Sequence, residues 1–199
     1  DEPFSNLDVG LRSQVRDLVL HVLKNSTSMT LMVTHDPEEA MFMGDRIAVM
    51  NKGRIIQLGT PEELFERPNH PFVGYFIGSP GMNVLPVRID GQGVHIGDHS
   101  IALEGQIPEI RDARMELGVR PEYVRIGEKG IPAKIVRVED TGRRKIVHAT
   151  VEGETVAAIV PEGAALPGEP HISFDPAGVN IYADSWRVDP VSARQGGAA

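Results

Sequence analysis

The sequence predicts two architectures in succession, an α/β segment followed by an all-β domain. Helix and strand patterns alternate in the first 79 residues, whereas later residues lose helical periodicity and carry short apolar runs between glycines and prolines. The stretch Gly78-Ser79-Pro80-Gly81 has the composition of a linker. We therefore expect one domain over residues 1–79, a second over 80–190, and a flexible tail over 191–199.

The first expected element is an amphipathic helix from Val9 to about Lys24, with Asp8 as its N-cap. Its apolar side chains recur at helical spacing, while arginine, aspartate and lysine occupy the other side. The residues of this apolar stripe are Leu11, Val15, Leu18 and Val22. The pattern predicts a helix that buries one face.

Strand and helix signals then alternate up to about residue 67. The almost wholly apolar run 29–35 predicts a strand buried on both faces of a parallel sheet. A helix is expected over 37–43, with proline at its first turn and glycine as its stop. A hairpin turning at 51–53 follows. The last helix of this part begins after Thr60, with Glu63 facing back as in a capping box.

The second part predicts a small closed barrel or a pair of barrels, because short apolar runs recur at regular spacing. We expect strands at 84–89, 93–96, 100–103, 115–119, 133–139, 145–151, 155–160, 171–174 and 180–183. Three aromatic residues near the end, Phe174, Tyr182 and Trp186, either plug the barrel or form a contact surface. Plugging is the commoner role for such residues.

Composition excludes several classes of function. The 199 residues carry a net charge of -8, and the one dense basic spot, Arg143-Arg144-Lys145, is too short for a phosphate-binding surface, so we expect no nucleic-acid partner. Cysteine is absent, which excludes disulfides and thiolate metal sites. No apolar run approaches the roughly 20 residues of a membrane helix. If the protein acts at a membrane, we expect it to be peripheral and not membrane-spanning.

The candidate catalytic residues are an acidic pair, Asp1 and Glu2, and the later His35. Adjacent acids alone mean little, but here a strand end, a helix and a second buried strand would bring strand C-termini to one sheet edge. We expect the acids and His35 to converge there on one ligand. A core histidine bonded to backbone is the alternative for His35, and Asp36 is expected mainly to cap the next helix.

Several stretches resemble a known family, the ATP-binding cassette (ABC) ATPases. DEPFSNLD resembles the end of a Walker B strand followed by the D-loop of these ATPases. Three later stretches resemble the importer subfamily, namely VTHDPEEAM, GDRIAVMNKGRIIQLGTPEELFERP and FVGYFIGSPGMN. The second part resembles the transport-associated OB-type (TOBE) regulatory domain of these ATPases at three stretches, LPVRI, LGVRPEYVRI and the closing FDP. The resemblance implies an α/β remnant of a P-loop NTPase nucleotide-binding domain, followed by an all-β OB-type barrel domain.

The resemblance also implies roles for individual residues. Asp1 would hold Mg²⁺ through its water shell, and with His35 it would contribute to binding ATP. Glu2 would orient and polarise the attacking water, while His35 would touch the γ-phosphate. The D-loop would contact the opposite subunit of a homodimer, and its residues are Ser5, Asn6, Leu7 and Asp8.

Two motifs of that family are absent from this sequence. It contains no Gly-x-x-x-x-Gly-Lys-Ser/Thr phosphate loop and no Leu-Ser-Gly-Gly-Gln signature. Both precede the Walker B acids in the family. We therefore expect this chain to be the C-terminal fragment of a longer ATPase, inactive alone and binding neither ATP nor Mg²⁺ by itself.

For the longer protein the resemblance implies the ATP-hydrolysing, energy-coupling subunit of an ABC importer. It would be cytoplasmic and peripheral on the inner face of the cell membrane, docked as a homodimer on permease transmembrane subunits that receive solute from a binding protein. The run FIGSPGMNVLP is most similar to importers of sugars, polyols and glycerol phosphates.

Two other functions remain open from the sequence. The OB-type barrels could form a regulatory and dimerisation module that binds a small ligand or a protein. A small metal-dependent hydrolase could use four polar side chains, Asp1, Glu2, His35 and Asp36. A terminal acid pair lacks the supporting hydrogen bonds that such a metal site needs, which disfavours the hydrolase.

Overall fold

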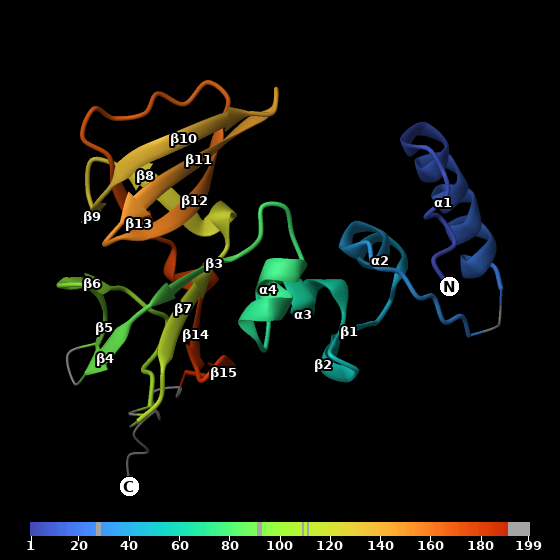
Figure 1. Cartoon of the computed structure of the whole chain (residues 1–199), viewed down its shortest axis with the longest axis horizontal. Coiled ribbons are helices and arrows are strands. Elements are labelled where there is room, and N and C mark those ends of the chain that lie inside the picture. The colour runs from blue at the N-terminus through green and yellow to red at the C-terminus, as the bar shows by residue number, and fades with distance from the viewer. Residues whose placement is uncertain (27–28, 91–92, 109, 111, 191–199) are drawn as a thin grey trace, which may run out of the picture.

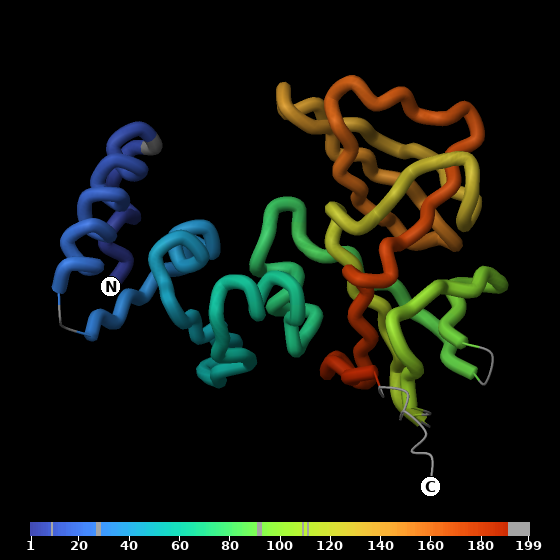
Figure 2. Tube along the Cα trace, turned by 180° about the vertical axis from the view of Figure 1, so that it is seen from behind, coloured from blue at the N-terminus to red at the C-terminus, as the bar shows by residue number. Residues whose placement is uncertain are grey.

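The structure is a computed structural model, and it describes residues 1–26, 29–90, 93–108, 110 and 112–190. The expected tail, 191–199, therefore lies outside the described residues. The molecule is elongated, with a long helix at one end, short helices and a hairpin in the middle, and all the remaining strands at the other end (Figures 1 and 2). The candidate catalytic residues belong to the helical end, far along the chain from the β-rich end.

Helix α1 spans Val9–Lys24, as predicted, and Asp8 caps it by accepting a hydrogen bond from the backbone N–H of Leu11 at 2.9 Å. Most of its apolar stripe is exposed, although Val15 is half-buried. Leu11, Leu18 and Val22 are 46%, 64% and 59% exposed. The helix therefore has the expected amphipathic pattern while most of its apolar side faces solvent.

Polar side chains instead connect α1 to helix α2, Pro37–Met43. The Arg12 guanidinium lies 3.8 Å from the carboxylate of Asp36, and Arg16 lies 4.1 Å from the ring centroid of Phe42. The Nε atoms of both arginines are buried without a hydrogen-bond partner in the described part of the chain. Since buried donors are normally paired, the contact between α1 and α2 is incompletely satisfied.

The prediction of a buried strand at 29–35 was wrong. These residues form no strand, and Met29 and Leu31 are 98% and 90% exposed. A strand buried in a parallel sheet needs hydrogen-bonding neighbours and a covering layer on each face. Within the described residues, one backbone hydrogen bond reaches this segment, from Glu2 N–H to the carbonyl of Val33 at 2.7 Å. Without neighbouring strands the apolar run stays irregular.

The middle of the molecule is a hairpin packed on two short helices. Strands β1, Ile47–Asn51, and β2, Arg54–Gly59, are antiparallel. Their turn falls at 51–53 as predicted, with Lys52 and Gly53 both at positive φ, 48° and 75°. The buried face packs on helices α3, Pro61–Glu66, and α4, Pro71–Phe76. This small core comprises Ile47, Val49, Leu64, Val73 and Ile77.

Local capping explains both short helices. Thr60 and Glu63 form the predicted capping box at the start of α3. Helix α4 was not predicted, because its N-cap is His70, whose Nδ1 accepts the N–H of Phe72 at 3.0 Å. Histidine is not a usual N-cap residue, although the proline that follows it is a helix-start signal.

The β-rich end consists of antiparallel strands and two single 3-10 turns. The strands are β3 Asn83–Pro86, β4 Arg88–Asp90, β5 Gly93–Ile96, β6 His99–Ile101, β7 Met115–Val119, β8 Val124–Gly127, β9 Ile131–Pro132, β10 Lys134–Asp140, β11 Arg144–Val151, β12 Glu154–Pro161, β13 His171–Phe174, β14 Val179–Ala183 and β15 Trp186–Val188. The turns are η1 Pro121–Tyr123 and η2 Pro176–Gly178. The predicted strands are all present, except that 84–89 is divided into two, whereas β8, β9 and β15 were missed.

These strands form four open sheets, an arrangement that agrees with the expected all-β, OB-type domain after a partial α/β domain, although the sheets do not join into one continuous hydrogen-bonded barrel. The sheet orders are β15-β14-β7-β3, β4-β5-β6, β10-β11-β12 and β8-β13-β9. A side chain bridges one gap: the amide of Asn83 on β3 donates to the carbonyl of Ala157 on β12 at 2.9 Å and accepts its N–H at 2.7 Å. All four sheets contribute side chains to one core, which includes Leu85, Leu117, Val124, Val156 and Ile172.

Candidate functional site

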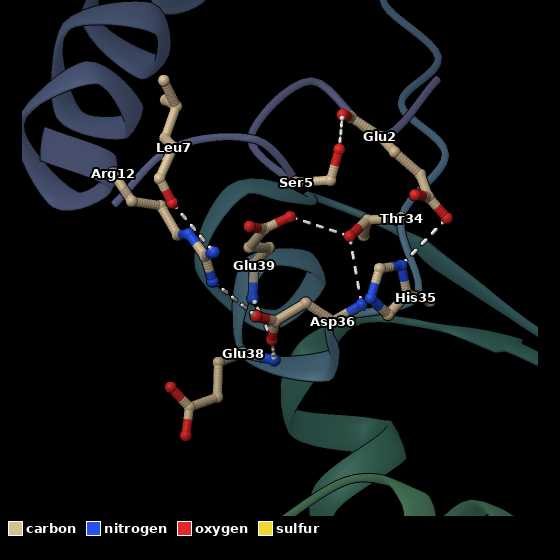
Figure 3. Close-up of polar contacts among 9 residues, drawn as sticks. All are labelled: Glu2, Ser5, Leu7, Arg12, Thr34, His35, Asp36, Glu38 and Glu39. Carbon is tan, nitrogen blue, oxygen red and sulfur yellow. Dashed lines mark hydrogen bonds and ion pairs between the residues drawn. The ribbon is translucent and has the colours of Figure 1, made fainter. Parts of the chain in front are cut away.

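The structure brings Glu2 and His35 into direct contact. The Oε1 atom of Glu2 lies 2.9 Å from Nδ1 of His35, although the two residues are 33 positions apart (Figure 3). The hydrogen bond from Glu2 N–H to the Val33 carbonyl places the start of the chain beside the segment that carries His35. Glu2 and His35 are thus neighbours, although the described residues form no parallel sheet there, and convergence of the acids and His35 on one ligand stays a prediction.

Both side chains are accessible to a ligand. The His35 side chain is 75% exposed and that of Glu2 is 45% exposed. An ion pair at such exposure contributes little, about 0–1 kcal/mol, so either group can leave the other for a better partner. The Glu2 backbone also has φ of 41°, in the left-handed region that non-glycine residues seldom adopt. The turn is held by Ser5, whose hydroxyl donates to the Glu2 carbonyl at 3.0 Å.

The residues on either side of His35 are anchored. The Thr34 hydroxyl donates to Oε2 of Glu39 at 2.7 Å and accepts the Asp36 N–H at 3.1 Å (Figure 3). Asp36 caps α2, as predicted, by accepting the N–H groups of Glu38 and Glu39. The exposed imidazole thus projects from a fixed backbone.

Sequence reasoning missed Thr34 and Glu39. Glu39 is only 4% exposed, and its carboxylate accepts the hydroxyl hydrogen of Thr34 instead of facing solvent. The available signal was its position three residues after the cap Asp36, where a glutamate commonly turns back toward the residues before the helix.

The predicted D-loop residues lie between the Glu2 turn and α1. Ser5 and Asp8 are engaged locally, since one holds the turn and the other caps the helix. Arg12 donates to the carbonyl of Leu7 at 3.1 Å and reaches Asp36, which links this loop to α2. Asn6 is exposed. Contact of these residues with an opposite subunit stays a prediction.

The donor set near Asp1 fits only one kind of magnesium site. Asp1 is exposed, and within the described residues its carboxylate makes no hydrogen bond or ion pair. In that same part of the chain, no three histidine or acidic side chains are grouped closely enough to hold a metal ion. The described side chains near Asp1 therefore do not form a complete set of protein ligands for a metal ion. A single carboxylate fits the mode in which Mg²⁺ keeps several waters and is shared with nucleotide phosphates.

A second cluster of polar contacts lies where α3 and α4 meet the β-rich end. Arg120, 3% exposed, donates from Nε to the carbonyl of Phe65 and from Nη1 to that of Ile77, both at 2.5 Å. Longer bonds reach the carbonyls of Gly74 and Leu64, at 3.3 and 3.4 Å. These oxygens belong to the C-terminal turns of two helices, where a cation is favoured. Burial lowers the pKa of the Arg120 guanidinium, and nearby carboxylates oppose that shift.

Aromatic residues extend this junction. The Tyr182 hydroxyl donates to the carbonyl of Pro68 at 2.9 Å, and the ring is fully buried, so burial raises its pKa. Tyr123 donates to the carboxylate of Glu66 at 2.9 Å. Of the three aromatics named from the sequence, Phe174 and Tyr182 are buried, whereas Trp186 is half-exposed.

The described helices offer no candidate for a membrane span, since none combines sufficient length with sufficient apolar character.

A cavity of about 460 Å³ lies at the junction between the end of α3 and strands β14 and β15. Its polar lining includes Glu66, Arg67, Asn180 and Arg187.

Comparison with known proteins identifies relatives over most of the chain. Residues 78–124 match the family model described as the MalK OB fold domain. An uncharacterized ABC transporter ATP-binding protein of Sinorhizobium fredii is 40% identical over 179 residues, which cover 85% of this chain and 47% of the relative.

Two further relatives are sn-glycerol-3-phosphate import ATP-binding proteins named UgpC. The one from Paracoccus denitrificans is 38% identical over 207 residues, covering 98% of this chain and 55% of the relative. The one from Chromobacterium violaceum is 37% identical over 169 residues, covering 82% and 46%. The chain thus spans about half the length of the curated relatives it matches. Because the likeness runs through both the helical and the β-rich parts, the chain belongs to the family of ABC transporter ATP-binding subunits.

Proposed function

We propose that this chain forms part of an ATP-hydrolysing subunit that drives an ABC importer, with nucleotide-facing residues in its domain 1–79 and a regulatory domain in 80–190. The observation that carries the proposal is the contact of Glu2 with His35. Two exposed side chains far apart in sequence meet on anchored backbone, in a chain that is 40% and 38% identical to ATP-binding proteins.

The proposed roles follow from the chemistry of each group. Glu2 orients the attacking water and accepts its proton, for which a carboxylate within hydrogen-bond reach is suited. His35, whose Nδ1 now contacts Glu2, turns toward the γ-phosphate and reports its presence. Asp1 supplies a carboxylate oxygen to the water shell of the metal. Bound Mg²⁺ and ATP supply the electrophilic phosphorus and charge neutralisation, while these residues supply placement.

The chain alone lacks part of this machinery. Its sequence has no phosphate-binding loop, and such loops provide the backbone N–H groups that hold nucleotide phosphates. We therefore propose that the isolated chain binds ATP too weakly for turnover. In the whole protein, the loop Ser5–Asp8 would face the second subunit of a homodimer.

The partners and the solute are proposed from the relatives. Proteins named for sn-glycerol-3-phosphate import are 35% to 38% identical over 82% or more of this chain. We propose a glycerol phosphate or a related polyol or sugar as the transported solute. The subunit would act at the inner face of the cell membrane, on permease subunits that a solute-binding protein serves.

A chimeric protein tests the catalytic roles. The N-terminal half of the Paracoccus denitrificans relative would be joined to this chain at the aligned acidic pair, and ATP hydrolysis measured. Glu2→Gln is expected to lower the rate by about 10²–10⁴-fold while nucleotide binding persists, because the variant keeps the shape of the side chain but cannot accept a proton. His35→Ala should also lower the rate.

The matched control is Glu38→Gln, whose carboxylate does not contact His35. It should leave hydrolysis unchanged. An active Glu2→Gln chimera, with contaminating ATPase excluded, would refute the proposed role of Glu2. Measurable hydrolysis by the isolated 199-residue chain that Glu2→Gln abolishes would contradict the need for a phosphate-binding loop.

A second candidate function is supported by the cavity beside β14 and β15. Its lining mixes acidic, basic and amide side chains, which suits a small polar ligand such as a polyol or a sugar phosphate. Binding of glycerol 3-phosphate to the isolated chain, measured by calorimetry and abolished by Arg187→Ala, would favour a regulatory module. Absence of binding would leave transport-coupled hydrolysis as the sole proposal.

A further inference from the structure

His70 is held in one protonation state by the helix it caps. Its Nδ1 accepts the backbone N–H of Phe72 at 3.0 Å. A backbone N–H can only donate, so Nδ1 must keep its lone pair and the ring must be neutral, with its hydrogen on Nε2. The carbonyl of His70 also accepts the N–H groups of Val73 and Gly74, at 2.9 and 3.3 Å. The first turn of α4 therefore depends on a neutral imidazole.

The same ring contacts the only tryptophan of the chain. The ring centroids of His70 and Trp186 are 5.3 Å apart and the rings are nearly perpendicular, at 86°. The next residue, Arg187, donates its N–H to the carbonyl of Asn69 at 2.9 Å. Strand β15 is thus fastened to the residues that start α4, both by a ring contact and by a backbone hydrogen bond.

Charged groups on the neighbouring elements are already engaged. These pairs are Glu116 of β7 with Arg114, Arg187 of β15 with Asp189, and Glu66 of α3 with Tyr123. Burial lowers the pKa of His70 from its ordinary 6.5, and the carboxylate of Glu116 raises it by a smaller amount. No unengaged carboxylate among these groups stands ready to receive an imidazolium.

We propose that His70 is a proton-sensitive latch between α4 and β15, in which protonation turns the capping acceptor into a donor and releases the helix start together with Trp186. Because the fold favours the neutral ring, the latch is closed above pH 6.5 and opens as the pH falls through the lowered pKa of His70. This device does not depend on ATP hydrolysis or transport.

The fluorescence of Trp186 provides the test in the full 199-residue chain. The emission would be followed from about pH 8 to about pH 5. We expect a single titration with a midpoint below pH 6.5, since a protonated imidazole quenches a neighbouring indole. His70→Asn should abolish the titration and keep the helix, because asparagine caps well and does not titrate. His171→Asn, away from the indole, is the matched control and should keep the titration.

A second measurement separates latch opening from simple quenching. Hydrogen exchange at the Phe72 amide, corrected for intrinsic rates, should be several-fold faster at low pH in the native chain but unchanged in His70→Asn. His70→Ala should show the fast exchange at every pH. The proposal is overturned if His70→Asn keeps the titration, if Phe72 exchange is insensitive to pH, or if the midpoint lies above pH 6.5, which would mean that the indole stabilises the imidazolium.

Discussion

The two ends of the molecule differ in what they do with large apolar side chains. In the first 59 residues many are exposed, namely Leu11, Leu18, Val22, Met29, Leu31, Val33, Phe42, Met50, Ile55 and Leu58. At the β-rich end, residues of the same kinds fill a common core. The β-rich end therefore carries its own hydrophobic stabilisation, whereas the helical end presents surfaces suited to burial and does not bury them.

The hairpin β1–β2 illustrates the difference. One face packs on α3 and α4, but the opposite face pairs Met50 with Ile55 and Ala48 with Leu58, and these residues are exposed. Strands that are apolar on both faces are typical of a sheet that is covered on both sides. In the proposed whole subunit, the rest of the nucleotide-binding domain would cover that outer face.

The largest effect is expected at the junction that separates the two ends. Arg120→Met should lower the free energy of unfolding by about 3–5 kcal/mol, because it removes a buried cation and leaves several helix-end carbonyls without donors. Urea unfolding measures this. Arg125→Met, which changes an exposed arginine, is the control and should cost less than about 0.5 kcal/mol. Equal losses would show that the junction is not a stabilising contact.

Two leucine substitutions compare the ends directly. Leu117→Ala, at a fully buried position in β7, should cost about 2–5 kcal/mol. Leu31→Ala, at a 90% exposed position, should change stability by less than about 0.5 kcal/mol. Thermal unfolding of both variants provides the measurement. A large loss for Leu31→Ala would mean that its segment is buried in solution, through self-association or refolding, and the contrast between the ends would fail.

Tyr182→Phe tests the hydrogen bond from the β-rich end to Pro68. The change keeps the ring but leaves a buried carbonyl without its donor, so a loss of about 1–2 kcal/mol is expected. Tyr75→Phe, at a ring 71% exposed, is the matched control and should be nearly neutral. If both variants unfold at the same urea concentration as the native chain, the hydroxyl of Tyr182 does not fasten the two parts.

The smallest expected effect lies at the helical end. Asp36→Ala removes the cap of α2 and the partner of Arg12, with an expected loss of about 1 kcal/mol. Because this end has few tertiary contacts, the loss should appear as faster hydrogen exchange at the Glu38 and Glu39 amides, with the β-strands unaffected. Glu38→Ala is the control. Faster exchange in the β-strands as well would show that the two ends unfold together.

Local signals predicted much of the fold. Asp8 and Thr60 cap the helices that their sequence positions indicated, and the turn at 51–53 has the positive φ angles that its glycine allows. The prediction of a buried strand at 29–35 was wrong because an apolar pattern of this kind fits a strand inside a complete sheet, and these residues have no neighbouring strands among the described residues. A pattern of burial can be read from sequence only when the covering partners are part of the same fold.

The candidate site was partly predictable for a different reason. The sequence led us to expect that Asp1, Glu2 and His35 converge on one ligand, and the structure places Glu2 in contact with His35. Their convergence on a ligand stays a prediction. Arg120 had no such signal, because its acceptors lie 43 to 56 positions earlier and are backbone carbonyls, which carry no side-chain identity. The capping role of His70 was likewise invisible, since it depends on which nitrogen holds a hydrogen.

The position of the Arg120 acceptors has a practical consequence for exchanging the β-rich part of this chain with that of a relative. Every carbonyl that this guanidinium binds lies between residues 64 and 77. A graft joined near residue 79, at the boundary predicted from the sequence, would separate the cation from its acceptors unless the recipient offered the same helix ends. If the two proteins were joined ahead of Ile47 instead, the β1–β2 hairpin, helices α3 and α4 and the Arg120 guanidinium would be transferred together, and the guanidinium would keep its acceptors.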